Sequence, residues 1–213
     1  LYNSFTLEVD KIEDISIKLL DEVLKIEKSN DDKVYIELYG SWDMKNEPVF
    51  SYKNNILLIE QKNTTSFYHK LLVLKLPENA ISKNTNLNVD MKSGSIELSQ
   101  FDLNKLSLSN VSGSTKVLES KFNVADINNV SGTIRIENCD ITELKTNSVS
   151  GSIYAEGTFS KADSNVVSGG ISITNKKDFE KDSSFNAVSG TITIELPENN
   201  NAKLKCETKS GTV

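Results

Sequence analysis

The sequence predicts an all-β fold: a single-stranded parallel β-helix, or solenoid, with coils of 19–21 residues and a β-rich N-terminal cap. Three observations predict it. A Ser-Gly pair recurs at near-equal intervals, apolar and polar residues alternate beside each pair, and amphipathic helical spacing is missing from the second half. At ~3.3 Å per residue, such a coil has a perimeter of roughly 60–70 Å, enough for two or three straight sides. The crossover rule for parallel strands favours a right-handed coil.

The repeat itself is regular. Ser-Gly begins at residues 93, 112, 131, 150, 168, 189 and 210, which gives intervals of 19, 19, 19, 18, 21 and 21 residues. In the fullest copies a Val precedes the pair and apolar residues follow with a period of two, as in Val130 to Ile136. We therefore expect Ile134 and Ile136 to point inward and neighbouring coils to pair as parallel strands ~4.8 Å apart. A glycine at each corner permits a positive φ.

Stacking the copies predicts a structural ladder of side-chain amides. Each Asn stands two residues before the Val and shares its parity, so we expect the set to point inward and to hydrogen-bond from coil to coil. A buried amide without a partner costs ~1–3 kcal/mol, and a ladder avoids that cost. The alternative is a run of turn residues that tolerate the left-handed conformation. The four positions are Asn128, Asn147, Asn165 and Asn186.

A candidate partner-binding surface follows from the opposite parity. The repeated Ser and the Ser or Thr two residues later should face solvent, at Ser131, Thr133, Ser150 and Ser152. Near the N-terminus, Tyr39 and Trp42 belong to an aromatic set that could bind a sugar or a protein, although packing in the cap is the alternative. Trp42 lies in the turn-like context of residues 40–43, where a large ring is more often exposed.

The chain divides at residue 70. Residues 1–69 lack the Ser-Gly period. Because an open solenoid end must be covered, we expect these residues to form a β-rich cap or partly degenerate coils. Alternating runs at 5–9, 15–19, 34–38 and 56–59 predict strands, and residues 30–32 and 53–55 predict hairpin turns. Residues 19–28 could instead form a short helix. Residues 70–213 form the solenoid, with Leu-Pro-Glu-Asn at 76–79 and again at 196–199.

Composition excludes several classes of protein. The 23 Lys and one Arg face 30 Asp and Glu, and the resulting net charge of −6 argues against nucleic-acid binding. No apolar run approaches the ~20 residues of a membrane-spanning helix. The two cysteines, Cys139 and Cys206, belong to different coils and should be lone thiols. The chain begins at Leu1, so we expect a removed N-terminal piece and a membrane link only through such a segment.

We expect the protein to have no catalytic activity, no bound metal and no cofactor. Parallel β-helices include polysaccharide lyases and hydrolases, which require converging carboxylates, but the acids here are dispersed along the repeats. The single histidine, His69, stands at the predicted junction of cap and solenoid, where a structural role is expected. Neither cysteine has His or Cys neighbours at zinc-ligand spacing. A carbohydrate-active enzyme remains a third hypothesis.

The repeats resemble a bacterial family of unknown function, DUF4097, whose members are called "putative adhesins". The Val-Ser-Gly-Thr-Ile copies, the Leu-Pro-Glu-Asn segments before Lys-Ser-Gly, and the opening runs at 15–18, 23–30 and 33–38 carry the resemblance. It covers nearly the whole chain. The resemblance implies a β-solenoid domain of a bacterial envelope protein, frequently behind an N-terminal membrane segment, and no catalytic residues.

These observations lead to two function hypotheses. The first is a non-enzymatic, extracytoplasmic binding or scaffold domain of a bacterial envelope protein, whose partner is a protein or a cell-surface polymer. The alternative is a cell-envelope stress sensor or regulator that acts through a membrane signalling partner, as the resemblance implies for some members. An uncovered last coil near Val213 would also allow an edge-to-edge homodimer.

Overall fold

The structure is a computed structural model that describes residues 1–42, 44–63, 70–198 and 203–213, and these residues contain strands but no helix. Nothing in those ranges forms a helix with the length and apolarity needed to cross a membrane. Residues 23–28 are a strand, so the helix considered for 19–28 is absent. The strands are β1 (Asn3–Glu8), β2 (Asp14–Leu19), β3 (Val23–Lys28), β4 (Lys33–Gly40), β5 (Val49–Lys53), β6 (Ile56–Glu60), β7 (Lys70–Leu76), β8 (Asn86–Ser93), β9 (Ser95–Ser99), β10 (Asp102–Ser112), β11 (Thr115–Leu118), β12 (Lys121–Ser131), β13 (Ile134–Ser150), β14 (Ile153–Ser168), β15 (Ile171–Asn175), β16 (Ser183–Glu195) and β17 (Leu204–Thr212).

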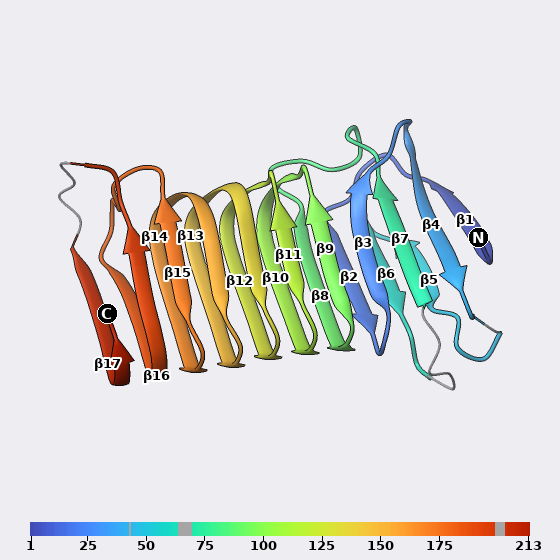
Figure 1. The fold of residues 1–213 in the computed structure, drawn as a ribbon. Coiled ribbons are helices and arrows are strands. Elements are labelled where there is room, and N and C mark those ends of the chain that lie inside the picture. The colour runs from blue at the N-terminus through green and yellow to red at the C-terminus, as the bar shows by residue number, and fades with distance from the viewer. Residues whose placement is uncertain (43, 64–69, 199–202) are drawn as a thin grey trace.

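The strands wind into a β-solenoid, as the repeat predicts, and its coils stack side by side along one axis (Figure 1). On one side of the coil, β8, β10 and β12 pair in parallel, and on another β9, β11 and β13 do the same. The long strands β13 and β14 run round a corner and belong to more than one side. Because Ser112 lies beside both Ser93 and Ser131, residues one repeat apart stack directly.

The core fills the inside of the coils. Ile134 and Ile136 are completely buried, as the alternation predicts, and they stack on Ile153 and Ala155 of the next coil. Each large aliphatic side chain removed from water in this way contributes about 1.5–3 kcal/mol. Continuous columns of such residues give the solenoid its stability, since no coil can bury its own apolar face alone.

The first coil is stacked out of sequence order. Strand β2 pairs in parallel with β6 on one side and β8 on the other, and β3 pairs in parallel with β7 and β9. The coil of residues 14–28 therefore lies between the coil built from β6 and β7 and the coil built from β8 and β9. Parallel coil pairing thus reaches back to Asp14, well inside residues 1–69.

Antiparallel strands cover the N-terminal end of this stack (Figure 1). Strand β4 pairs antiparallel with β7, β1 pairs antiparallel with β4, and β5 forms a hairpin with β6. Asn54 and Asn55 have the positive φ angles, 52° and 62°, that the predicted hairpin turn at 53–55 requires. The hairpin predicted at residues 30–32 is wrong, because β7 lies between β3 and β4 and pairs with both.

Candidate functional site

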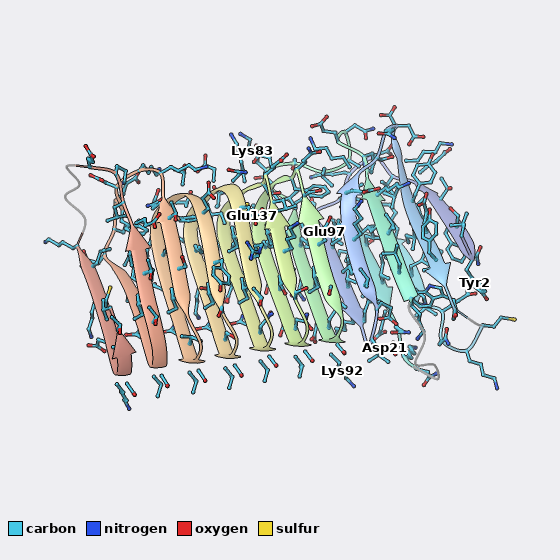
Figure 2. The ribbon with its side chains drawn as sticks, in the orientation of Figure 1. Tyr2, Asp21, Lys83, Lys92, Glu97 and Glu137 are labelled. Atoms are coloured by element: carbon cyan, nitrogen blue, oxygen red, sulfur yellow. The ribbon has the colours of Figure 1, made fainter. Side chains whose placement is uncertain are left out.

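The Ser-Gly repeats lie along one edge of the solenoid, which we call the Ser-Gly edge. The Ser of each repeat stands immediately before a glycine with φ between 109° and 154°, where the chain turns from one side of the coil to the next. Figure 2 shows the result as an evenly spaced row of short side chains along the lower edge, starting at Lys92. Its first column, the Ser column, consists of Ser93, Ser112, Ser131, Ser150, Ser168, Ser189 and Ser210.

The valines before these serines are exposed, not buried. Their exposed fractions lie between 43% and 49%, so the predicted inward orientation of the Val is wrong. The prediction extended the in–out alternation of Ile134 back through Gly132 to Val130. The chain turns at Gly132, so the alternation does not continue from one side of the turn to the other. The residue that points inward is Asn129, 4% exposed. The Val column consists of Val111, Val130, Val149, Val167 and Val188.

The amide ladder is present, but it lies on the outside. Asn147 donates from Nδ2 to Oδ1 of Asn128 at 2.7 Å, Asn165 donates to Asn147 at 2.9 Å, and Asn186 donates to Asn165 at 2.8 Å. At its start, Asn128 donates to Oδ1 of Asp126 at 2.8 Å. All four are half-buried strand residues with ordinary φ, so the inward orientation was wrong for the same reason as for the valines, and the turn alternative is excluded. We call this column the Asn ladder.

A second ladder was missed on β8, β10 and β12, near the start of these strands. Asn123 donates to Asn104 at 3.0 Å, Asn104 to Asn86 at 2.9 Å, and Asn86 to Oδ1 of Asp14 at 2.9 Å. The spacings of 18 and 19 residues were visible in the sequence, but no Ser-Gly pair stands next to them. In both ladders the bonds between coils are donated toward the N-terminal end, and both ladders begin at an aspartate.

Two of the four predicted hydroxyl residues face solvent as expected, and two are half-buried. Ser131 and Ser150 are exposed, and Thr133 and Ser152, just past the glycines, are half-buried on the neighbouring side of the edge. In the coils before them, the Ser114 hydroxyl donates to Ser95 Oγ at 3.1 Å, so this second set of hydroxyls also stacks from coil to coil. Ser131 and Ser150 end the strands β12 and β13, and the backbone carbonyls of Thr133 and Ser152 accept N–H groups of the neighbouring coil, so the backbone has little freedom to lose on binding.

A groove runs between the Val column and the Asn ladder. It has a volume of about 330 Å³, and its walls include Val149, Val167 and Val188 on one side and Asn147 and Asn165 on the other. Apolar side chains and amide groups therefore line the same shallow channel along the stack.

The Ser-Gly edge carries no charge in its five middle coils. The three columns there hold only Ser, Val and Asn, from Ser109 to Ser189. Charges stand at both ends: Asp90 and Lys92 occupy the ladder and Val positions of the first Ser-Gly coil, and Glu207 and Lys209 those of the last. All four are exposed.

The predicted aromatic surface at Tyr39 and Trp42 does not form. Trp42 is only 5% exposed, and its indole Nε1 donates to the carbonyl oxygen of Tyr39 at 2.9 Å. The chain folds back after β4, because the Trp42 N–H bonds the Gly40 carbonyl, and the ring is turned inward. Tyr39 is half-buried and donates to Oε2 of Glu37 at 2.8 Å.

Beneath Trp42 lies a buried group of charges. Nζ of Lys70 is 5.4 Å from the centre of the Trp42 ring, 3.2 Å from Oδ1 of Asp21 and 3.7 Å from Oε1 of Glu22. The side chains of Lys70 and Glu22 are fully buried. Burial raises the pKa of Glu22 to about 7, with Asp21 adding to the rise and Lys70 opposing it. The second carboxylate oxygen of Glu22 accepts the N–H groups of Leu20 and Asp21.

The remaining reactive side chains are isolated. Cys139 and Cys206 are free thiols, as predicted, and burial raises the pKa of Cys139 to about 11. Over the ranges that the structure describes, no three His, Cys, Asp or Glu side chains are grouped so that they could hold a metal ion. His69 lies outside the described residues.

Comparison with known proteins agrees with this architecture. A family model described as "Toastrack DUF4097" matches residues 12–213. No curated protein shows significant similarity to the chain in sequence.

Two solved structures have the same fold. A "putative adhesin" from Bacteroides fragilis is 16% identical with a TM-score of 0.53, and the match covers 99% of this chain and 96% of that one. A "putative adhesin" from Parabacteroides merdae is 15% identical with a TM-score of 0.52, and the match covers 99% and 95%. At these identities the likeness concerns the fold alone.

Proposed function

This chain belongs to the Toastrack DUF4097 family, and from that premise we propose that it is a binding domain without catalytic activity. It works outside the cytoplasm, at the cell envelope or surface, and its Ser-Gly edge contacts a protein or a surface polymer. The solenoid acts as the rigid support of that edge.

One observation carries the proposal: three uncharged columns are held in register along the same edge. The five half-exposed valines form a continuous apolar strip, and contiguous strips of a few hundred Å² on a folded domain commonly mark an interaction site. Dispersed apolar residues would not have this meaning. Hydroxyl and amide columns flank the strip and supply both donors and acceptors.

The chemistry of the edge suits an extended, uncharged partner. Serine hydroxyls and asparagine amides at ~4.8 Å spacing can bond a chain that offers regularly spaced polar groups, such as a glycan or a peptide backbone. A strongly charged partner would lose its hydration against the five middle coils without gaining an opposite charge. The partner we expect is therefore neutral where it touches the five middle coils.

Binding of purified domain to cell-wall sacculi, to a glycan array and to surface-protein fractions tests the proposal. Val149→Asp places a charge in the middle of the Val column, and we expect it to weaken the binding at least tenfold. Thr193→Asp is the matched control, because Thr193 is also exposed but lies on β16 past the glycine corner. Both variants should melt at the wild-type temperature. Equal binding by all three proteins, or binding by none, would contradict the proposal.

Protease treatment of intact cells tests the location. The domain should be digested without lysis if it is exposed outside the cell. Complete protection until lysis contradicts an extracytoplasmic position and directs the search to partners inside the cell.

A further inference from the structure

The charges at the two ends of the Ser-Gly edge have a regular arrangement. In the first Ser-Gly coil, that of Ser93, Asp90 holds the ladder position and Lys92 the Val position; in the last Ser-Gly coil Glu207 and Lys209 do the same. Each end thus carries an acid and a base, always in the same columns. Within the described part of the chain, Asp90, Lys92 and Lys209 form no ion pair, while Glu207 pairs with Lys205 at 2.9 Å.

From this arrangement we propose that the partner of the Ser-Gly edge is a second copy of the same chain, docked with its solenoid parallel to the first. The inference rests on the proposed function and names its partner. A two-fold axis along the stack, between the Asn ladder and the Val column, makes every coil face the same coil of the other copy. Each Val column then lies on the Asn ladder of the other copy, along the groove between them.

Charge decides the orientation. In the parallel arrangement Lys92 faces Asp90 of the partner subunit, and Lys209 faces Glu207 of the partner subunit, so the symmetry produces four opposite-charge pairs. In the antiparallel arrangement each column meets itself with the coils reversed. Asp90 would then face Glu207 of the partner subunit, and Lys92 would face Lys209 of the partner subunit, so every pair would repel.

The middle of the edge fits the same partner. Its five coils have no charge, and a copy of the same surface brings none, so no charged group is buried without a partner. Seven coils at ~4.8 Å make a contact ~29 Å long. Three columns of that length bury on the order of 1,000 Å² in total, the lower end of the range for specific interfaces, so the association should be weak and strengthened by clustering.

Analytical ultracentrifugation of the whole chain, from micromolar to millimolar concentration, tests the association. We expect a monomer–dimer equilibrium that Lys92→Asp and Asp90→Lys each weaken at least tenfold. The double variant Asp90→Lys/Lys92→Asp restores the opposite pairing and should recover the wild-type dissociation constant. Lys121→Glu, an exposed charge change away from the edge, should leave it unchanged. A wild-type chain that stays monomeric at millimolar concentration overturns the inference, as does a double variant no better than the single ones.

Cysteine cross-linking tests the orientation. In a Cys206→Ser background, Ser109→Cys in one preparation and Val111→Cys in another should form a mixed disulfide when combined, because the ladder and Val positions of one coil face each other. Val111→Cys combined with Val188→Cys should not, although both side chains are exposed. Cross-linking of the second pair in place of the first overturns the parallel arrangement.

The outcome for the proposed function is separate. A charge variant that is monomeric but still binds sacculi or surface proteins, with Val149→Asp abolishing that binding, refutes the second copy as partner and leaves the binding function intact. Loss of every interaction in Val149→Asp, with self-association recovered in the charge-swapped variant, supports both.

Discussion

The same corner of the coil is built in two ways, by Ser-Gly in the repeats and by Asp21-Glu22 in the first coil. Asp21 and Glu22 occupy the positions of Ser93 and Gly94 in the neighbouring coil. In the repeats, the backbone makes the turn, with a positive φ that only glycine adopts readily. In the first coil, a buried carboxylate makes it by accepting two backbone N–H groups, and a buried lysine balances the charge.

The difference shows what repetition requires. A Cβ on the glycine of one coil would overlap the carbonyl oxygen of the residue at the same position in the preceding coil, and this holds at Gly94, Gly113, Gly132, Gly151, Gly169, Gly190 and Gly211. The preceding residue may have a side chain, as Glu22 does beneath Gly94, but the following one may not. A side chain is therefore tolerated at Glu22, whose corner precedes the seven glycine corners.

Gly169→Ala should severely destabilise the fold. Gly169 has a φ of 139° and its new Cβ would overlap the carbonyl oxygen of Gly151, so we expect a loss of more than ~4 kcal/mol in urea unfolding. The adjacent Gly170→Ala is the control, since the nearest atom to its Cβ lies at 3.6 Å. If both variants lose the same free energy, the close approach of the backbones is not what requires glycine.

Lys70→Met should cost about 3 kcal/mol at pH 8, because it leaves the buried Glu22 carboxylate without its balancing cation. Lys75→Met, on the same strand, removes a half-exposed ion pair with Glu37 and should cost less than ~1 kcal/mol. Chemical unfolding of both variants compares the two. Equal losses would show that the corner of the first coil does not depend on its buried charges.

The first-coil corner should also make stability depend on pH. The folded-state pKa of Glu22 is raised to about 7, above its value in the unfolded chain, so the folded state binds more protons between those values. The free energy of unfolding should therefore fall as pH rises from about 5 to 7, by up to ~1.4 kcal/mol per pH unit. Glu22→Gln should flatten this slope in urea titrations at several pH values. A slope identical to that of the wild type would rule out Glu22 as its source.

The Asn ladder is a weaker, side-chain version of the contact between coils. Asn147→Ala removes one donated and one accepted hydrogen bond at a half-buried position, and we expect a loss of ~1 kcal/mol. Asn88→Ala, at an exposed position of β8, serves as the reference and should be nearly neutral. Thermal melting distinguishes them, and an Asn147→Ala curve that overlays the wild type would show that the ladder does not stabilise the stack.

Ser150→Ala should have the smallest effect, within ~0.5 kcal/mol, because the hydroxyl is exposed at the corner. A larger loss in the melting curve would mean that the serine, and not only the glycine after it, builds the turn. In binding assays the same variant reports whether the hydroxyl itself contacts a partner.

The repeat made the fold predictable, because six near-equal intervals and a period of two specify the coil length and inward isoleucines such as Ile134. The prediction from the repeat failed at the corner. Extending the alternation from Ile134 through Gly132 placed Val130 inside the coil, but Val130 points outward. That error hid the apolar strip, the main feature of the candidate site. Periodicity describes straight strands only, and the rotation of the chain at a glycine with positive φ leaves no trace in it.

The N-terminal region was less predictable for a different reason. The insertion of the β2–β3 coil between β6–β7 and β8–β9 is a matter of which strands pair over long sequence distances, and alternation alone does not select partners. Likewise Trp42 lies in a turn-like sequence but is buried by its contact with Lys70, which follows it by 28 residues. Both features depend on contacts between segments that share no repeat.

The two Asn ladders also give the solenoid a side-chain dipole along its axis. Every amide that bonds the next coil donates toward the N-terminal end, so these dipoles add, as peptide dipoles add in a helix. Each series begins at an aspartate carboxylate, Asp14 in the neighbouring coil for one ladder and Asp126 in the same strand as Asn128 for the other. At the far end, the next position beyond Asn186 is Glu207, which cannot donate in turn. The side-chain dipoles therefore give the solenoid a direction along its axis. A partner that lies along the solenoid meets a surface whose two ends differ.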